Sequence, residues 1–108
     1  MNWIVVNTKP LCEEKACVNL IRQNFKVFAP KICKTVSRFN RLKKILRPLF
    51  PGYIFVEISP KQNWTKINNT YGVKKILDFG EKPFFLPINI IQDLKKNCDR
   101  NEIFFLNR

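Results

Sequence analysis

Cysteines are the residues of this sequence with the widest chemistry, because a thiolate can bind a metal ion or act as a nucleophile. They occur as Cys12, Cys17, Cys33 and Cys98, without a Cys-x-x-Cys pair, and the 108 residues include no histidine. A metal site would therefore lack imidazole ligands, and a nucleophile would lack its usual base. We expect reduced thiols, with Cys17 in the core. A four-thiolate zinc site is the alternative that these scattered spacings disfavour.

Carboxylates offer no acid–base pair either. Glu13 and Glu14 are the only adjacent acidic residues, and neighbours on a helix point in different directions. Both suit the first turn of a helix, where negative charge meets the helix dipole. The sequence therefore predicts neither an enzyme nor a bound metal or cofactor.

The net charge indicates a polyanionic partner. Twenty Lys and Arg stand against 8 Asp and Glu, a formal charge of +12, and counterion release favours nucleic acid as the neighbour. A membrane surface is the rival. However, apolar runs such as Trp3–Val6 are far shorter than the roughly 20 residues of a spanning helix, and the N-terminus does not resemble a signal peptide. We expect a cytoplasmic protein without a membrane partner.

Periodicity and turn residues predict four strands and three helices. The strands are Trp3–Asn7, Phe25–Pro30, Tyr53–Ile58 and Val73–Phe79. The helices run from Pro10 to about Asn24, from Ser59 through Ile67, and from Pro87 to about Lys96, with Ile91 and Leu94 on one apolar face. A chain of this length encloses one core, so we expect a single α+β domain. Its mainly antiparallel sheet of about four strands is flanked by the three helices.

The first predicted helix has two different faces. Its buried stripe consists of Ala16, Cys17, Leu20 and Ile21. Its polar face carries only amide and cationic groups, on Lys15, Asn19, Arg22 and Gln23. Such groups can bind phosphates and base edges. A merely solvated helix surface is the alternative, and the helix considered alone favours it.

A basic segment, Lys31–Arg47, follows the second predicted strand. It contains seven basic residues and no acidic one, and its apolar residues show little regular period. We expect a basic loop or loose hairpin. A solubilising loop is possible on this pattern, but seven uncompensated charges repel one another unless an anion is near. Proximity to nucleic acid is therefore favoured.

The strand Tyr53–Ile58 is apolar on both faces. Ile54, Val56 and Ile58 point to one side, and Tyr53, Phe55 and Glu57 point to the other. An aromatic face must be covered, either by a helix of the same chain or by a partner. The pattern leaves both possibilities open.

Four segments together resemble the NusG N-terminal domain family. They are Trp3–Pro10, Leu49–Val56, Thr70–Val73, and Phe79–Gly80 before Pro87. The resemblance covers roughly residues 2–98, leaves 99–108 as a tail or linker, and implies one domain without a KOW domain in these 108 residues. The short distance between Phe-Pro-Gly-Tyr and Thr-Tyr-Gly-Val is more similar to the specialised RfaH-like branch.

The resemblance implies RNA polymerase as the partner. In the family, an apolar surface binds the clamp helices of the largest catalytic subunit, and the matching positions are Tyr53, Phe55, Phe79, Ile91 and Leu94. A contact with the gate loop of the other large subunit aligns with Asn63, Trp64 and Thr65, of which only Thr65 keeps the RfaH-type hydroxyl.

The resemblance also implies binding to the non-template DNA strand. The matching positions are Lys9, Lys15, Asn19, Arg22, Gln23, Thr70, Tyr71, Gly72 and Val73. They include the whole polar helix face, so the resemblance reverses the preference for a solvated surface. Asn19 and Tyr71 replace a histidine and an arginine that are common in the RfaH-like branch.

As a whole, the resemblance implies a monomeric elongation and antitermination factor that bridges the main cleft of polymerase and suppresses pausing. The charge suits two alternatives. One is a free-standing RNA-binding or ribosome-associated module, and the other is a competitor that occupies the NusG site on polymerase.

Overall fold

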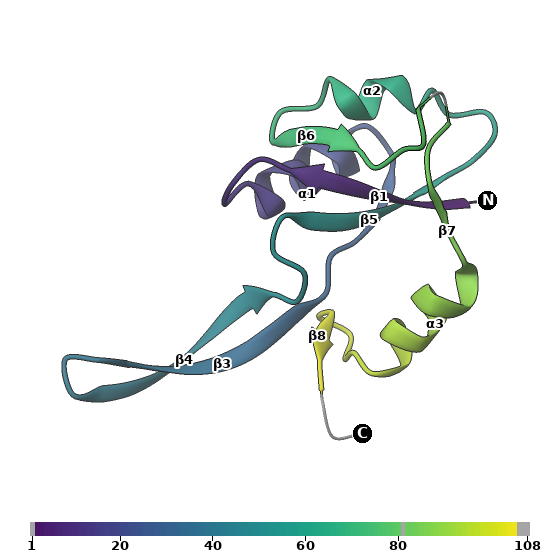
Figure 1. Cartoon of the computed structure of the whole chain (residues 1–108). Helices are drawn as coiled ribbons and strands as arrows, with labels where there is room; N and C mark the ends of the chain where they lie inside the picture. Colours follow the sequence, from purple (N-terminus) through teal and green to yellow (C-terminus); the bar gives the residue numbers. More distant parts are fainter. Residues whose placement is uncertain (1, 81, 106–108) are drawn as a thin grey trace.

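The structure is a computed structural model that describes residues 2–80 and 82–105 (Figure 1). Its elements, in chain order, are β1 (Asn2–Thr8), α1 (Glu13–Arg22), β2 (Lys26–Phe28), β3 (Lys31–Arg38), β4 (Arg41–Pro48), β5 (Tyr53–Ile58), α2 (Thr65–Asn68), β6 (Val73–Ile76), β7 (Phe85–Leu86), α3 (Ile88–Lys96) and β8 (Ile103–Phe104). The predicted α+β class and the three predicted helices are confirmed.

The main sheet is antiparallel and centred on β1. Its order is β2-β5-β1-β6, and β7 also pairs with β1. The longest register joins β1 to β5, from Asn2 opposite Ile58 to Asn7 opposite Tyr53. The four predicted strands are all present. The two-residue strand β7 is an addition, since so short a strand leaves no periodic pattern.

A smaller sheet has the order β4-β3-β8. The basic segment forms its β3–β4 hairpin, which has eight residue pairs and projects from the body of the domain (Figure 1). Strand β8 pairs parallel to β3, and Lys31 N donates a hydrogen bond to Glu102 O at 2.8 Å. The prediction of a tail or linker after residue 98 is therefore wrong as far as Phe105, and residues 106–108 lie outside the described part.

The two faces of the main sheet bury separate core clusters. Ile54, Val56 and Ile58 of β5 belong to the first cluster, together with Ala16 and Leu20 of α1. Phe55 belongs to the second cluster, which also contains Trp3, Val5, Phe28 and Ile91. The alternation predicted for β5 is confirmed. The open question about the aromatic face has two answers, because the second cluster with Ile91 of α3 covers Phe55, whereas Tyr53 on the same face is 42% exposed.

Helix α1 differs from its predicted form in two ways. It begins at Glu13 rather than near Pro10, because Leu11 has a φ of 59° and the backbone before the helix bonds elsewhere. Thr8 N donates to Gly52 O and Lys9 N to Gly72 O. The predicted buried stripe is wrong at Ile21, whose side chain is exposed, while Cys17 is partly buried against the first cluster.

Two other elements are shorter than the sequence predicted. Helix α2 contains only four residues, so Ser59–Asn63 forms turns instead of its first part. Strand β6 ends at Ile76 rather than Phe79. Beyond that point the chain makes a bridge between Asp78 and Pro83 and leaves Phe79 in the turn between them.

Candidate functional site

The thiols do not form a reactive centre. All four cysteines are free, and the described residues contain no group of three or more potential metal ligands. Burial raises the pKa of the Cys17 thiol to about 11, so it stays protonated at neutral pH and is a poor nucleophile. Among residues 2–80 and 82–105, no helix has the length and apolar character needed to cross a bilayer.

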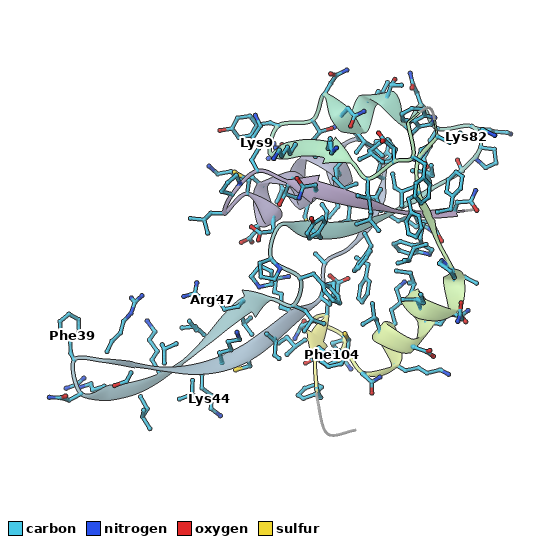
Figure 2. All side chains as sticks on the ribbon, viewed as in Figure 1. Lys9, Phe39, Lys44, Arg47, Lys82 and Phe104 are labelled. Carbon is cyan, nitrogen blue, oxygen red and sulfur yellow. The ribbon has the colours of Figure 1, made fainter. Side chains whose placement is uncertain are left out.

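The polar face of α1 meets the turn Thr70–Val73. Asn19 Nδ2 donates to Tyr71 O at 3.3 Å. Gln23 Nε2 donates both to Thr70 Oγ1 at 2.8 Å and to Asn19 O at 3.1 Å. Segments about fifty residues apart in sequence thus form one surface, and Lys9, just after the end of β1, lies beside the turn (Figure 2). We call this surface, made by α1 and the turn, the helix–turn surface.

Gly72 allows this close approach. Its φ is +95°, and a Cβ added there would lie 2.9 Å from Ala16 N and 3.3 Å from Cys12 O. Both neighbours are backbone atoms of the start of α1, so neither can move aside as a side chain would. Only glycine fits both the conformation and the space.

The residues of the helix–turn surface divide into exposed and supporting ones. Lys9, Lys15, Arg22 and Tyr71 are exposed, and Lys15 Nζ lies 5.8 Å from the centroid of the Tyr71 ring. Thr70, Gly72 and Val73 are buried, so direct DNA contact through their side chains is not possible in this structure.

The two amide side chains also have a supporting role. Both amide hydrogens of Gln23 have acceptors within the protein, and the amide nitrogen of Asn19 donates to the turn. Bidentate reading of an adenine needs the donor and the acceptor of one amide together. Such reading by Gln23 would require breaking the bonds that hold the turn. Lys9, Lys15, Arg22 and Tyr71 are therefore the members whose side chains are available for binding.

Three of the five predicted clamp-binding residues, Phe55, Ile91 and Leu94, belong to the second core cluster or pack against it, and not all are accessible. Phe55 is 6% exposed and Ile91 1% exposed, so both are core residues. Leu94 packs at the edge of the cluster, and Phe79 is 80% exposed with its ring edge-on to Phe84 at 5.4 Å. The expectation of direct contact is thus corrected for Phe55 and Ile91, which support the surface from beneath.

Tyr53 lies at a different part of this surface. Its side chain is 42% exposed and lines an open groove of about 570 Å³ between α1 and the base of the hairpin. Val18 and Ile21 of α1 and Leu46 of β4 also line it. The groove explains why Ile21 is exposed, since this part of α1 faces away from the sheet's core. We call Tyr53, Phe79 and Leu94 with this groove the apolar surface.

Phe50 also belongs to the apolar surface, although the sequence had not identified it as a candidate. It is exposed, and its ring meets Phe55 edge-on at a centroid distance of 5.6 Å. The surrounding prolines suggested only a rigid turn. The available signal was a second aromatic residue placed just before the strand that carries Tyr53 and Phe55.

The predicted gate-loop residues stand at the start of α2. Asn63 Oδ1 accepts hydrogen bonds from the backbone N of Thr65, at 3.0 Å, and from the Thr65 hydroxyl. Trp64 packs against the first core cluster, whereas Asn63 and Thr65 are exposed. Trp64 therefore anchors the segment, and the two polar side chains are the accessible ones.

The fold is that of an α+β domain with an exposed apolar surface and a basic helix–turn surface. A family model described as transcription termination factor NusG matches residues 1–95. The chain is 35% identical over 81 residues to the transcription termination/antitermination protein NusG of Staphylococcus epidermidis, covering 66% of this chain and 44% of that protein. Identity to the proteins of that name from Halalkalibacterium halodurans and Bacillus subtilis is 32% over 82 residues, covering 67% of this chain and 46% of each.

The chain therefore belongs to the NusG family, a family of non-enzymatic transcription factors. It spans less than half the length of these curated relatives. None of these matches tests the RfaH-like branch, which stays a prediction.

Proposed function

We propose that this chain is the polymerase-binding domain of a transcription elongation and antitermination factor, acting in the cytoplasm as a monomer. One observation carries the proposal. The second core cluster buries Phe55 and Ile91 but leaves Phe79 exposed and Leu94 at its edge. An apolar area with a well-packed base is the kind of site in which a partner helix can dock.

The partner of this apolar surface would be the clamp helices of the largest polymerase subunit. A helical coiled coil presents side chains at regular spacing, which suits a shallow apolar groove. Tyr53 and Phe79 are the aromatic anchors, because both side chains are exposed: Tyr53 lines the groove, and the Phe79 ring lies edge-on to Phe84. Burying such anchors in a desolvated contact contributes about 2 kcal/mol or more each.

Asn63 and Thr65 would contact the gate loop of the other large subunit. Their side chains are already held together by hydrogen bonds, so little conformational freedom is lost on binding. Simultaneous contact with both subunits would bridge the main cleft. The domain would then bind the closed, elongating state more tightly than the open, paused state and shift the population towards elongation.

The helix–turn surface would face the non-template DNA strand. Lys9, Lys15 and Arg22 supply cations for phosphates, and Tyr71 offers a ring on which an unpaired base can stack. Asn19, Gln23 and the turn hold Tyr71 in place. Recruitment of the RfaH-like kind would use this surface.

The formal charge of +12 favours a second candidate function, that of a free-standing RNA-binding or ribosome-associated module. Such a module would bind RNA tightly in the absence of polymerase, with an affinity that falls steeply as salt rises. A protein that only occupies the NusG site would compete with NusG without changing elongation.

Single-round transcription through a strong pause site tests the proposal. Saturating amounts of the chain are expected to shorten the pause half-life severalfold, and the Tyr53→Ala, Phe79→Ala double variant is expected to lose this effect. A pause half-life unchanged by the wild-type chain would reject the elongation role. If the chain also displaced NusG, that result would identify the competitor instead.

A further inference from the structure

The groove between α1 and the base of the β3–β4 hairpin has an acidic rim in a strongly basic chain. Of the 8 Asp and Glu residues, its lining includes Glu13, Glu14 and Glu102. Glu13 Oε2 accepts a hydrogen bond from Gly52 N at 3.1 Å. Glu102 Oε1 accepts one from Ala29 N at 3.4 Å, so two of the three carboxylates are held in place. We call this site the acidic groove.

The walls of the acidic groove are apolar and incompletely covered. Val18 and Ile21 of α1 and Leu46 of β4 are all exposed. The volume of about 570 Å³ lies in the range of sites that hold a ligand. Its described lining does not include Phe79 or Leu94, so most of the groove is separate from the rest of the apolar surface. An occupant is therefore expected to combine an apolar group with positive charge.

The tip of the β3–β4 hairpin has this combination. Phe39 and Asn40 form its two-residue loop with φ values of 52° and 61°, and the Phe39 side chain is 96% exposed. Loops of this kind favour asparagine and glycine, so a bulky residue with positive φ is an outlier. Arg38 and Arg41 pair directly beside the loop, and Figure 2 shows Phe39 at the far end of the hairpin. The tip is thus an exposed aromatic residue flanked by two cations.

The two faces of the hairpin differ in charge. Cross-strand partners share a face, and successive residues alternate between faces. One face carries five exposed cations, which are Lys34, Arg38, Arg41, Lys43 and Arg47. The other face carries Lys31 and Lys44. Its apolar residues Leu42 and Leu46 are exposed. Leu46, Pro48 and Lys31 of this weakly charged face also line the acidic groove, so the face and the groove are continuous.

We propose that two copies of the chain form a dimer in which the hairpin tip of each copy enters the acidic groove of the other. Phe39 packs against the apolar walls, and Arg38 and Arg41 meet the carboxylates of the rim. The two hairpins lie antiparallel, with their weakly charged faces together. Each groove lies at the base of its own hairpin, which is about 27 Å long at roughly 3.4 Å per residue. One twofold axis therefore forms both contacts.

The net charge limits the strength of this dimer. Each copy carries a formal charge of +12, which opposes association. At physiological salt, however, repulsion between exposed charges is largely screened beyond about 8 Å. The contacts between tip and groove act within that distance, and each occurs twice. The dimer is therefore expected to be weak and to depend on concentration.

Sedimentation equilibrium of the 108-residue chain tests the association, over a roughly hundredfold range of concentration. The average mass is expected to rise from that of a monomer towards that of a dimer and no further, because reciprocal insertion leaves no tip or groove free. A monomer at every concentration would overturn the proposal. Growth beyond the dimer would overturn it as well, since it indicates an open chain of copies.

Phe39→Asn tests the tip. Asparagine accepts positive φ, so the loop should be kept while the ring is lost. The variant is expected to associate about a hundredfold more weakly, because an anchor is lost at both ends of the dimer. Phe39→Trp is expected to restore association. Phe85→Thr, which removes an exposed aromatic residue of β7 outside the tip and the groove, is the control and should change association less than twofold.

Charge reversal tests the rim. Arg38→Glu lowers the net charge, which by itself favours association, yet it is expected to weaken the dimer about tenfold. Glu14→Lys is expected to weaken it by a similar factor, and the two changes together should restore it to within about threefold. Asp93→Lys makes the same change of sign as Glu14→Lys, on α3 and outside the groove, and is expected to have less than a twofold effect.

Three results with these variants would also overturn the proposal. They are equal effects of Phe39→Asn and Phe85→Thr, equal effects of Glu14→Lys and Asp93→Lys, and a double charge reversal no better than the weaker single one. Amide hydrogen exchange in β3 and β4 verifies the hairpin in each tip variant, and Phe39→Gly replaces Phe39→Asn if protection is lost.

The dimer has a consequence for polymerase docking, which rests on the proposed function. Tyr53 lines the acidic groove, so the dimer covers one of the two proposed aromatic anchors. The monomer is then the form that binds polymerase, and self-association keeps part of the chain in an inactive form. Because the association experiments contain no polymerase, their failure leaves polymerase docking to its own test, and failure of docking leaves the dimer unaffected.

Discussion

Replacing Phe55 with alanine is expected to lower the free energy of unfolding by about 3–5 kcal/mol. The ring is 6% exposed and packs on Phe28, at a centroid distance of 6.0 Å, and on Phe50, at 5.6 Å. Its removal loses the transfer free energy of the side chain and leaves a cavity that the strand β5 cannot close. Urea unfolding with an unchanged m-value would measure the loss.

Tyr53→Ala is the matched control for this prediction. It changes an aromatic residue of the same strand, two positions away, whose side chain is 42% exposed. We expect it to cost less than about 1 kcal/mol. If Phe55→Ala were as mild as Tyr53→Ala, Phe55 would be part of a docking surface rather than of the core.

Gly72→Ala is expected to destabilise the domain by several kcal/mol, about 2–4. The new Cβ would lie 2.9 Å from Ala16 N, so the turn would have to separate from α1. That movement would break the hydrogen bonds from Asn19 to Tyr71 and from Gln23 to Thr70. Binding to the non-template strand in an elongation complex should fall with stability, because Tyr71 loses its position.

Gly80→Ala separates steric clash from backbone strain. Gly80 has nearly the same φ, +91°, but no atom lies within 4 Å of an added Cβ. We expect this substitution to cost only about 1 kcal/mol, from the positive φ itself. Equal effects at Gly72 and Gly80 would show that the contact with Ala16 is unimportant, and thermal unfolding of both variants makes the comparison.

Elements with long, local signals were predictable from the sequence. Strand β5 was expected at Tyr53–Ile58 and has those bounds, because alternating apolar residues follow a rigid turn. Helix α3 lies within a residue of its expected start, since Pro87 precedes it. Strands β7 and β8, with two residues each, exist through pairing with distant segments. No local sequence pattern predicts strands as short as these.

The sequence predicted which residues of the candidate site lie together. It did not predict which of them are exposed for binding and which support the surface from within. Spacing on a helix placed Lys15, Asn19 and Gln23 together, which the contact with the turn 70–73 confirms. Spacing could not reveal that Gln23 donates both of its amide hydrogens within the chain. Likewise, alternation identified the face of Phe55, but only the second core cluster, with Ile91 of α3, shows that Phe55 itself is already covered.

Binding to an isolated clamp-helix fragment of the largest polymerase subunit tests the central claim most directly. The Tyr53→Ala, Phe79→Ala variant is expected to raise the Kd by several hundred-fold or more, since two anchors of about 2 kcal/mol each contribute about 4 kcal/mol. Tyr71→Ala, which removes an exposed tyrosine from the helix–turn surface, should leave the Kd within twofold. An unchanged Kd in the folded double variant, or no binding by the wild-type chain, would contradict the account.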